Sequence, residues 1–130
     1  MENRNDLVKE WISKAEHDVG MAKLASEYTD AICFHCQQAV EKYLKAFLTY
    51  LNIDFKKSHS LSYLLDLIAE RVKITEEIYA KADQLESYAV KIRYPVEWPE
   101  PSIEEASEAY NHVLYFKKMF LEQMVLNEEK

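Results

Sequence analysis

The chain has 130 residues, a length that fits a single domain over residues 1–130 with a core of its own. It contains one glycine and three prolines, which excludes the Gly-rich phosphate loops of P-loop and dinucleotide-binding proteins and favours long helices over strands. The formal net charge of −7 should repel nucleic acid unless basic residues gather in a local patch.

The first predicted helix begins after Asn5 or Asp6, either of which could cap it, and runs to about Glu27. Its apolar residues recur at helical spacing and should form a buried stripe of Val8, Trp11, Ile12, Ala15, Val19 and Ala22. Gly20 lies inside this pattern. We interpret it as a point where a neighbouring helix approaches closely, with a functional hinge as the alternative.

A second helix, capped by Thr29 or Asp30, should reach about Asn52. At 100° per residue, one broad apolar face comprises Ile32, Ala39, Tyr43, Ala46, Phe47 and Tyr50. The polar segment 52–58 then breaks the pattern, and a shorter helix is predicted over about residues 60–71.

A fourth helix is predicted from Thr75 to about Ala89, because the acidic residues at its start favour the helix dipole. Three prolines close together exclude a helix interior, so residues 90–101 should form an extended loop. Ser102-Ile103-Glu104-Glu105 has the pattern of a capping box that opens the last helix. These elements predict an all-α fold, an antiparallel four-helix up-down bundle with a short fifth helix.

No run of 18 apolar residues is present, and residues 1–6 lack the layout of a signal peptide. We therefore expect a cytoplasmic protein with no membrane or DNA partner. Cys33-x-x-Cys36 invites a redox or zinc interpretation, but it lies in mid-helix, and only a rearranged His59 or His112 could complete a zinc site. Buried free thiols are the favoured interpretation, and we expect no metal and no cofactor.

The second helix carries a polar stripe within an otherwise apolar circumference. An arc of about 80° holds the residues His35, Gln38, Lys42, Lys45 and Thr49, with Glu41 at its edge. Each such group costs roughly 1–3 kcal/mol when it is buried without a partner, and a charge costs more. The stripe must therefore meet water, polar partners or a cleft. A solvated face with a satisfied histidine is one interpretation, and the floor of a pocket or a polar dimer seam is the other.

Four segments, in chain order, resemble the HEPN family. The segment from Cys33 to Leu48 is similar to the signature of that family's second helix, which has a histidine, two glutamines, a Glu-Lys pair and Leu-Lys-Ala. His59-Ser60-Leu61 resembles the start of the third helix, and residues 88–95 resemble an Arg-Tyr-Pro segment. The region from Trp11 to Asp18 is similar to the first helix of the family.

The resemblance, which spans about residues 7–120, implies a bundle that forms homodimers, often beside a minimal nucleotidyltransferase in a two-component, toxin–antitoxin-like system. The family name also implies nucleotide binding. Many members are metal-independent endoribonucleases with an Arg-x4–6-His motif, in which the histidine transfers a proton and the arginine supports the phosphate. Here Trp, Pro and Glu occupy residues 98–100 after Arg93, and the next histidine is His112, so this motif is missing.

We expect a ligand-binding set of His35, Gln38, Lys42, Lys45, His59, Arg93 and Tyr94, with no catalytic residue among them. The preferred hypothesis is a non-nucleolytic, dimeric module that binds a partner protein, a nucleotide or RNA. The alternative is an endoribonuclease toxin with a rearranged site, in which His35 or His59 is the base and Arg93 holds the phosphate. For His59, which precedes a helix, capping or orienting that helix competes with catalysis.

Overall fold

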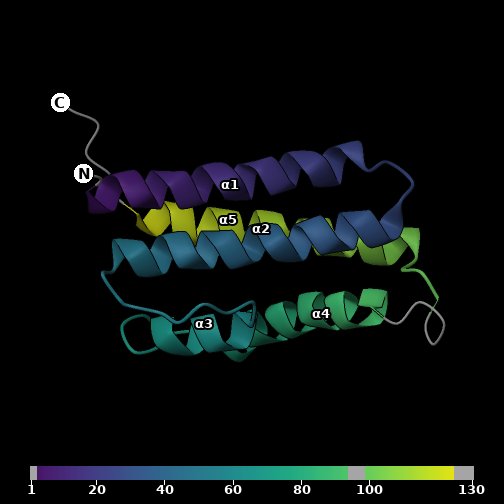
Figure 1. Ribbon diagram of the computed structural model, residues 1–130. Coiled ribbons are helices and arrows are strands. Elements are labelled where there is room, and N and C mark those ends of the chain that lie inside the picture. The colour runs from purple at the N-terminus through teal and green to yellow at the C-terminus, as the bar shows by residue number, and fades with distance from the viewer. Residues whose placement is uncertain (1–2, 94–98, 125–130) are drawn as a thin grey trace.

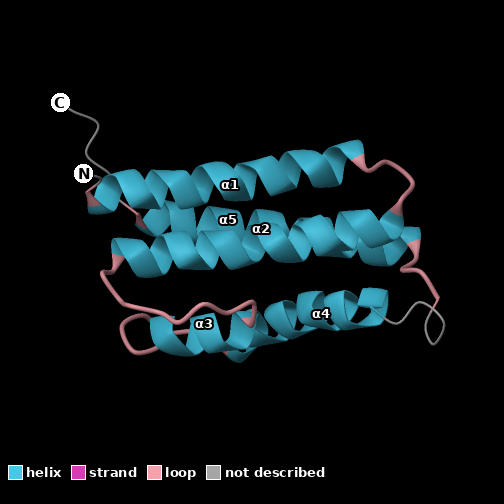
Figure 2. Cartoon of the chain, in the orientation of Figure 1, coloured by secondary structure: helices cyan, strands magenta, loops and turns pink. Residues whose placement is uncertain are grey.

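The computed structural model describes residues 3–93 and 99–124, with only the backbone for residues 91–93. The helices in this part are α1 (Arg4–Leu24), α2 (Thr29–Tyr50), α3 (Leu61–Ile68), α4 (Glu76–Arg93) and α5 (Ile103–Gln123). They are joined by loops, with no strand in the described residues, which confirms the all-α prediction (Figure 2). The helices α1 and α4 run in one direction and α2 and α5 in the other, while the short α3 lies beside α4 (Figure 1).

The second helix, α2, is the centre of the bundle, because it contacts each of the other four helices. Its apolar side chains are buried around most of its circumference, in the set Cys33, Cys36, Ala39, Val40, Tyr43, Leu44, Ala46, Phe47 and Leu48. Phe47 packs against Phe120 of α5, with ring centroids 4.9 Å apart, and Phe116 stacks on Phe120. These aromatic contacts bury large apolar areas and hold α5 along α2.

Capping explains where two of the helices begin. The Asn3 side chain caps α1 by accepting from the backbone N–H of Asp6, and the Asp6 side chain accepts from the backbone N–H of Asn3. The predicted start after Asn5 or Asp6 is therefore wrong. The predicted capping box of α5 is confirmed. The Ser102 hydroxyl accepts from the Glu105 N–H at 3.0 Å, and the Glu105 carboxylate accepts from the Ser102 N–H at 2.9 Å.

Two other predicted boundaries differ from the structure. No side chain caps α2, so Thr29 and Asp30 lie inside that helix rather than before it. α4 continues to Arg93, one turn past the predicted end at Ala89. A proline restricts the residue before it and not residues further back, so the first proline, Pro95, permits helix up to residue 93.

The single glycine does not mark a close helix contact. No atom lies within 4 Å of the place where a Cβ of Gly20 would stand, so the interpretation of a close approach is wrong. Instead, two residues with side chains adopt the left-handed conformation that glycine favours, Ser26 with φ of 58° and Asn52 with φ of 61°. They follow α1 and α2, where such a residue turns the chain out of the helix.

The helices α4 and α5 meet at few points, through polar groups. Nε2 of the buried His112 donates to Oε1 of Gln84 at 2.6 Å, and the Gln84 amide donates to Oε1 of Glu108 at 2.9 Å. Burial lowers the pKa of His112, Lys81 lowers it further, and Glu108 opposes the change. This α4–α5 seam therefore holds a neutral histidine. No described helix has the combined length and hydropathy needed to cross a bilayer.

We expect the free energy of unfolding to fall as the pH drops below about 6.5, in part because of His112. The pKa of His112 is lower in the folded than in the unfolded chain. As the pH falls, the unfolded chain therefore takes up the proton first. The contribution of His112 to the free energy of unfolding is complete above the unfolded-state pKa and is lost below it. His112→Gln should flatten the decline, measured by urea unfolding with circular dichroism between about pH 8 and pH 5.

His17→Gln is the matched control, because His17 is an exposed histidine on α1. It should leave the pH dependence of stability as it is in the parent. If His112→Gln and the parent lost stability equally over this range, His112 would not be the responsible group.

Candidate functional site

One half of the polar stripe is neutralised by α1. Asp18 is buried there, and its Oδ1 accepts from Nδ1 of His35 at 2.9 Å while its Oδ2 accepts from Nζ of Lys42 at 2.5 Å. We name Asp18, His35 and Lys42 the Asp18 cluster. It borders a shallow groove of about 430 Å³ whose other lining residues are Ser13, Lys14 and His17. The two contacts give the buried carboxylate the partners that it requires.

The other half is neutralised by a carboxylate of α2 itself. Oε2 of the buried Glu41 accepts from Nζ of Lys45 at 2.9 Å, and its Oε1 accepts from Nδ1 of His59 at 3.1 Å. The Lys45 ammonium also lies 5.4 Å from the ring centroid of Trp11, a cation–π contact with α1. We name Glu41, Lys45 and His59 the Glu41 cluster. The His59 side chain is 73% exposed, so its ring reaches solvent.

A groove of about 560 Å³ opens beside the Glu41 cluster, and we name it the polar groove. It lies between α2, the start of α3 and α4, and is lined by Phe34, Gln37, Gln38, His59, Ser60, Glu86, Ala89 and Val90. The Gln38 amide donates to Oε1 of Gln37, and the Gln37 amide donates to the His59 carbonyl oxygen at 3.3 Å. Phe34 and Val90 are 43% and 48% exposed. The groove thus combines hydrogen-bonding amides with open apolar surface.

Glu86 is the carboxylic acid of the polar groove. Its Oε2 accepts from the Leu61 N–H at 2.7 Å, which fastens the first turn of α3 to α4. Burial raises the pKa of Glu86, the bond from Leu61 opposes this, and Asp83 and Glu41 add to the rise. The described lining contains no lysine or arginine. The groove therefore suits hydrogen-bonding and apolar ligand groups better than an isolated phosphate.

The structure separates the predicted site residues into two neighbouring groups. His35 and Lys42 meet on Asp18, whereas Lys45 and His59 meet on Glu41. Gln38 lines the polar groove together with His59. The stripe is therefore more than a solvated face, because each of its charges contacts a buried carboxylate, but it does not converge on one cleft.

Two predicted site residues cannot be placed beside these groups. Arg93 is the last residue of α4, but its side chain and all of Tyr94 lie outside the described residues. Their roles stay predictions. The capping interpretation of His59 is wrong, because the Ser60 hydroxyl caps α3 by accepting from the Tyr63 N–H at 3.2 Å.

Sequence reasoning missed two of the carboxylates that organise this region. Asp18 lies within the apolar stripe of α1, at helical spacing from Ala15 and Ala22. A charged residue in such a stripe needs a buried partner, so a signal was present in the sequence. Glu86 gave no such signal, because its partner is a backbone N–H of α3 that only the tertiary fold brings near.

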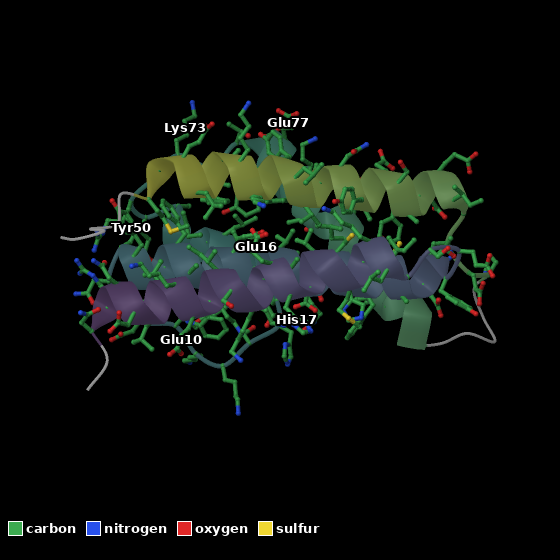
Figure 3. All side chains as sticks on the ribbon, turned by 90° about the horizontal axis from the view of Figure 1, so that it is seen from above. Glu10, Glu16, His17, Tyr50, Lys73 and Glu77 are labelled. Atoms are coloured by element: carbon green, nitrogen blue, oxygen red, sulfur yellow. The ribbon has the colours of Figure 1, made fainter. Side chains whose placement is uncertain are left out.

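A further carboxylate, Glu16, links three helices. It lies between α1 and α5, whereas His17 lies on the outer side of α1 (Figure 3). Glu16 accepts from the hydroxyl of the fully buried Tyr43 at 2.5 Å and from Nζ of Lys117 at 2.9 Å. Burial would raise the pKa of Glu16, but these two partners lower it overall. Because Tyr43 is inaccessible, we assign this contact to the fold and not to a site.

Cys33 and Cys36 are free and fully buried, which confirms the interpretation of buried thiols. Burial is the main cause that raises the pKa of each thiol to about 12. Neither forms the reactive thiolate at neutral pH. Within the described residues, no group of three or more histidine, cysteine, aspartate and glutamate side chains is arranged to hold a metal ion.

Comparison with known proteins gives two matches. The HEPN domain matches residues 8–124, a range that includes part of every helix and both clusters. The fold is similar to the crystal structure of an archaeal HEPN homologue, with a TM-score of 0.72 and 27% sequence identity over 95% of this chain and 98% of that chain. No curated protein sequence matches this chain.

Asp18→Asn should lower the free energy of unfolding by about 1–3 kcal/mol, because the Lys42 ammonium then lacks an anionic partner. Urea unfolding at neutral pH measures the change. Glu77→Gln is the control, since it removes an ion pair with Lys81 in which the Glu77 side chain is 67% exposed. The control should alter stability by less than about 0.5 kcal/mol. Equally small changes in both variants would mean that the Asp18 cluster is not a buried charge centre.

Proposed function

Because this chain belongs to the HEPN domain family, we propose that it is a non-nucleolytic, dimeric binding module that uses the polar groove for recognition. Its partners are a second copy of the chain and a minimal nucleotidyltransferase, in a two-component, toxin–antitoxin-like pair. Nucleotide binding is the accompanying activity that the family name suggests. The proposal extends to a cytoplasmic location for the pair.

The observation that carries this proposal is the pairing of the two lysines that would otherwise face a phosphate. Lys42 is bound to Asp18 and Lys45 to Glu41, so the charge of each ammonium is compensated inside the bundle. A metal-independent nuclease site of the Arg-x4–6-His type uses an uncompensated cation for the phosphate and a histidine for proton transfer. The histidine at the family spacing from Arg93 is missing. This distribution of charge supports binding over cleavage.

The surface of the polar groove supports a protein partner. The exposed Phe34 and Val90 offer apolar area, while Gln37 and Gln38 lie beside them with amide groups. An apolar centre with hydrogen-bonding neighbours and few charges is typical of protein interfaces. In a two-fold dimer, the same patch on each copy covers the patch on the other, so one substitution changes both halves of the interface.

Phe34→Glu should weaken dimerisation by about tenfold or more, because it puts a charge in the apolar part of the interface. Sedimentation velocity over a concentration series measures the dimer dissociation constant. Leu114→Glu is the matched control, since Leu114 on α5 is exposed to the same 43% but does not line the polar groove. It should leave the dimer unchanged.

A parent chain that is strictly monomeric would contradict the proposal, as would a Phe34→Glu variant that dimerises as tightly as the parent. The parent and the Phe34→Glu variant, each co-expressed with a minimal nucleotidyltransferase, test the second partner by co-purification. Loss of the dimer without loss of the nucleotidyltransferase would assign the groove to the homodimer alone.

A ribonuclease with a rearranged site is the second candidate, and the geometry of His59 favours it. Glu41 holds Nδ1 of His59, which leaves Nε2 at the exposed end of a ring that borders the polar groove. A carboxylate that orients a histidine in this way is a common arrangement for a general base. His35 has a similar partner in Asp18 but does not line the polar groove.

If this second candidate is correct, the chain should cleave RNA without added metal, and His59→Ala should reduce the rate by about 100-fold or more. Cleavage of a fluorescently labelled single-stranded RNA in the presence of a chelator measures the rate. His17→Ala, an exposed histidine on α1, is the control and should keep full activity. Activity that survives in both His59→Ala and His35→Ala would reject these residues as bases.

A further inference from the structure

One end of the bundle carries the three most exposed large apolar side chains of the described residues. Leu24 is 81%, Ile103 75% and Tyr28 65% exposed. Leu24 ends α1, Tyr28 directly precedes α2 and Ile103 opens α5, and Figure 1 shows these three chain positions at the same end. Single exposed apolar residues are ordinary, but such a group on one surface marks a contact region.

An apolar groove of about 360 Å³ lies at this end of the bundle, with Ile103 in its lining, and we name it the end groove. It is lined by Ala22, Lys23, Ser26, Thr29, Ile32, Ile103, Ala106, Ser107 and Tyr110. Residues of α1, α2 and α5 line it, and the small side chains Ala22 and Ala106 are its most buried lining residues. Ile103 stands exposed at its edge. The end groove can therefore receive apolar side chains from outside.

Three acidic residues, Glu27, Asp30 and Glu104, directly follow lining residues of the end groove in the sequence. Glu27 precedes α2, Asp30 lies in the first turn of α2, and Glu104 and Glu105 lie in the first turn of α5. Burial is the main cause of the raised pKa of Cys33, and the charges of Glu105 and Asp30 both add to it.

Three of these carboxylates have no ion-pair partner within the described part of the chain. No ion pair of Glu27, Asp30 or Glu104 occurs there. Among the described lining residues of the end groove, Lys23 is the one basic side chain. An apolar hollow whose lining residues are followed in the sequence by unpaired carboxylates is complementary to apolar side chains that are flanked by positive charge.

We propose that the end groove docks a basic amphipathic segment of a partner protein, whose apolar side chains fill the hollow and whose lysines or arginines meet the carboxylates of Glu27, Asp30 and Glu104. Charge selects this occupant. A second copy that presents the same end brings like charges together, and RNA or an anionic lipid surface is repelled. The end groove is lined by other residues than the polar groove, so the inference does not rest on dimerisation there.

The test uses two labelled probe peptides with the full chain. One is an amphipathic helical peptide of leucine and lysine, and the other has glutamate in place of each lysine. Fluorescence anisotropy should show binding of the leucine–lysine peptide and none of the leucine–glutamate peptide. The affinity should fall as salt increases from low to physiological concentration, because exposed charges are screened.

Variants locate the binding site. The double variant Leu24→Ser/Ile103→Ser should weaken binding of the leucine–lysine peptide by about tenfold or more, since apolar area is lost from the contact. Leu114→Ser, which also removes an exposed leucine, should change the affinity by less than about twofold. Glu27→Gln/Glu104→Gln should reduce the salt dependence. Circular dichroism verifies that every variant is folded.

Failure of this inference can be told apart from failure of the dimer proposal, because Phe34→Glu should leave peptide binding unchanged. The inference is overturned if the leucine–lysine peptide does not bind, if the leucine–glutamate peptide binds equally, or if Leu24→Ser/Ile103→Ser keeps the parent affinity. Self-association that is lost in Leu24→Ser/Ile103→Ser but kept in Phe34→Glu would also overturn it, by assigning the end groove to a second copy.

Discussion

A charge inside a helical bundle must have a partner at a defined distance, and α2 carries several such charges although it contacts all four other helices. Asp18 reaches Lys42 from α1, and Glu41 on α2 holds both Lys45 and His59. Removing either carboxylate leaves a partly buried cation without its anion. The pairs also set the register of α1 against α2, since a shift by one turn, about 5.4 Å, separates Asp18 from Lys42.

The same pairing decides what the surface can offer to a ligand. The ammonium groups of Lys42 and Lys45 are paired with carboxylates inside the bundle. The polar groove therefore presents amides, an imidazole and the carboxyl group of Glu86. The end groove presents apolar area, and the carboxylates of Glu27, Asp30 and Glu104 are next in sequence to its lining residues. The helix α2 contributes to both, through Gln37 in the polar groove and Ile32 in the end groove. In our proposals, a second copy and a basic segment therefore occupy separate surfaces of one rigid helix.

The helices were predictable from the sequence because their signals are local. Apolar periodicity and the capping box at Ser102 need no knowledge of the rest of the fold. Asn3 was missed as the cap of α1 because several neighbouring residues are also suitable caps. The interpretation of Gly20 was wrong because a single sequence does not show which atoms pack against a residue. The polar stripe identified groups that need partners. The contact of Asp18 with the stripe and the hydrogen bond of Glu86 with Leu61 both depend on how distant segments approach, which local patterns do not encode.

The α4–α5 seam also sets an order in which the molecule comes apart. Hydrogen bonds of Gln84 join α4 to α5, whereas interlocked apolar side chains join α5 to α2. Regions with few packed contacts open at lower free energy than the core. The seam between α4 and α5 is thus the contact that opens first, while the buried apolar side chains of α3 and α4 stay packed on α2. The polar groove has one wall on α2 and the other on α3 and α4, so its width is set by this packed contact and is kept when the α4–α5 seam opens.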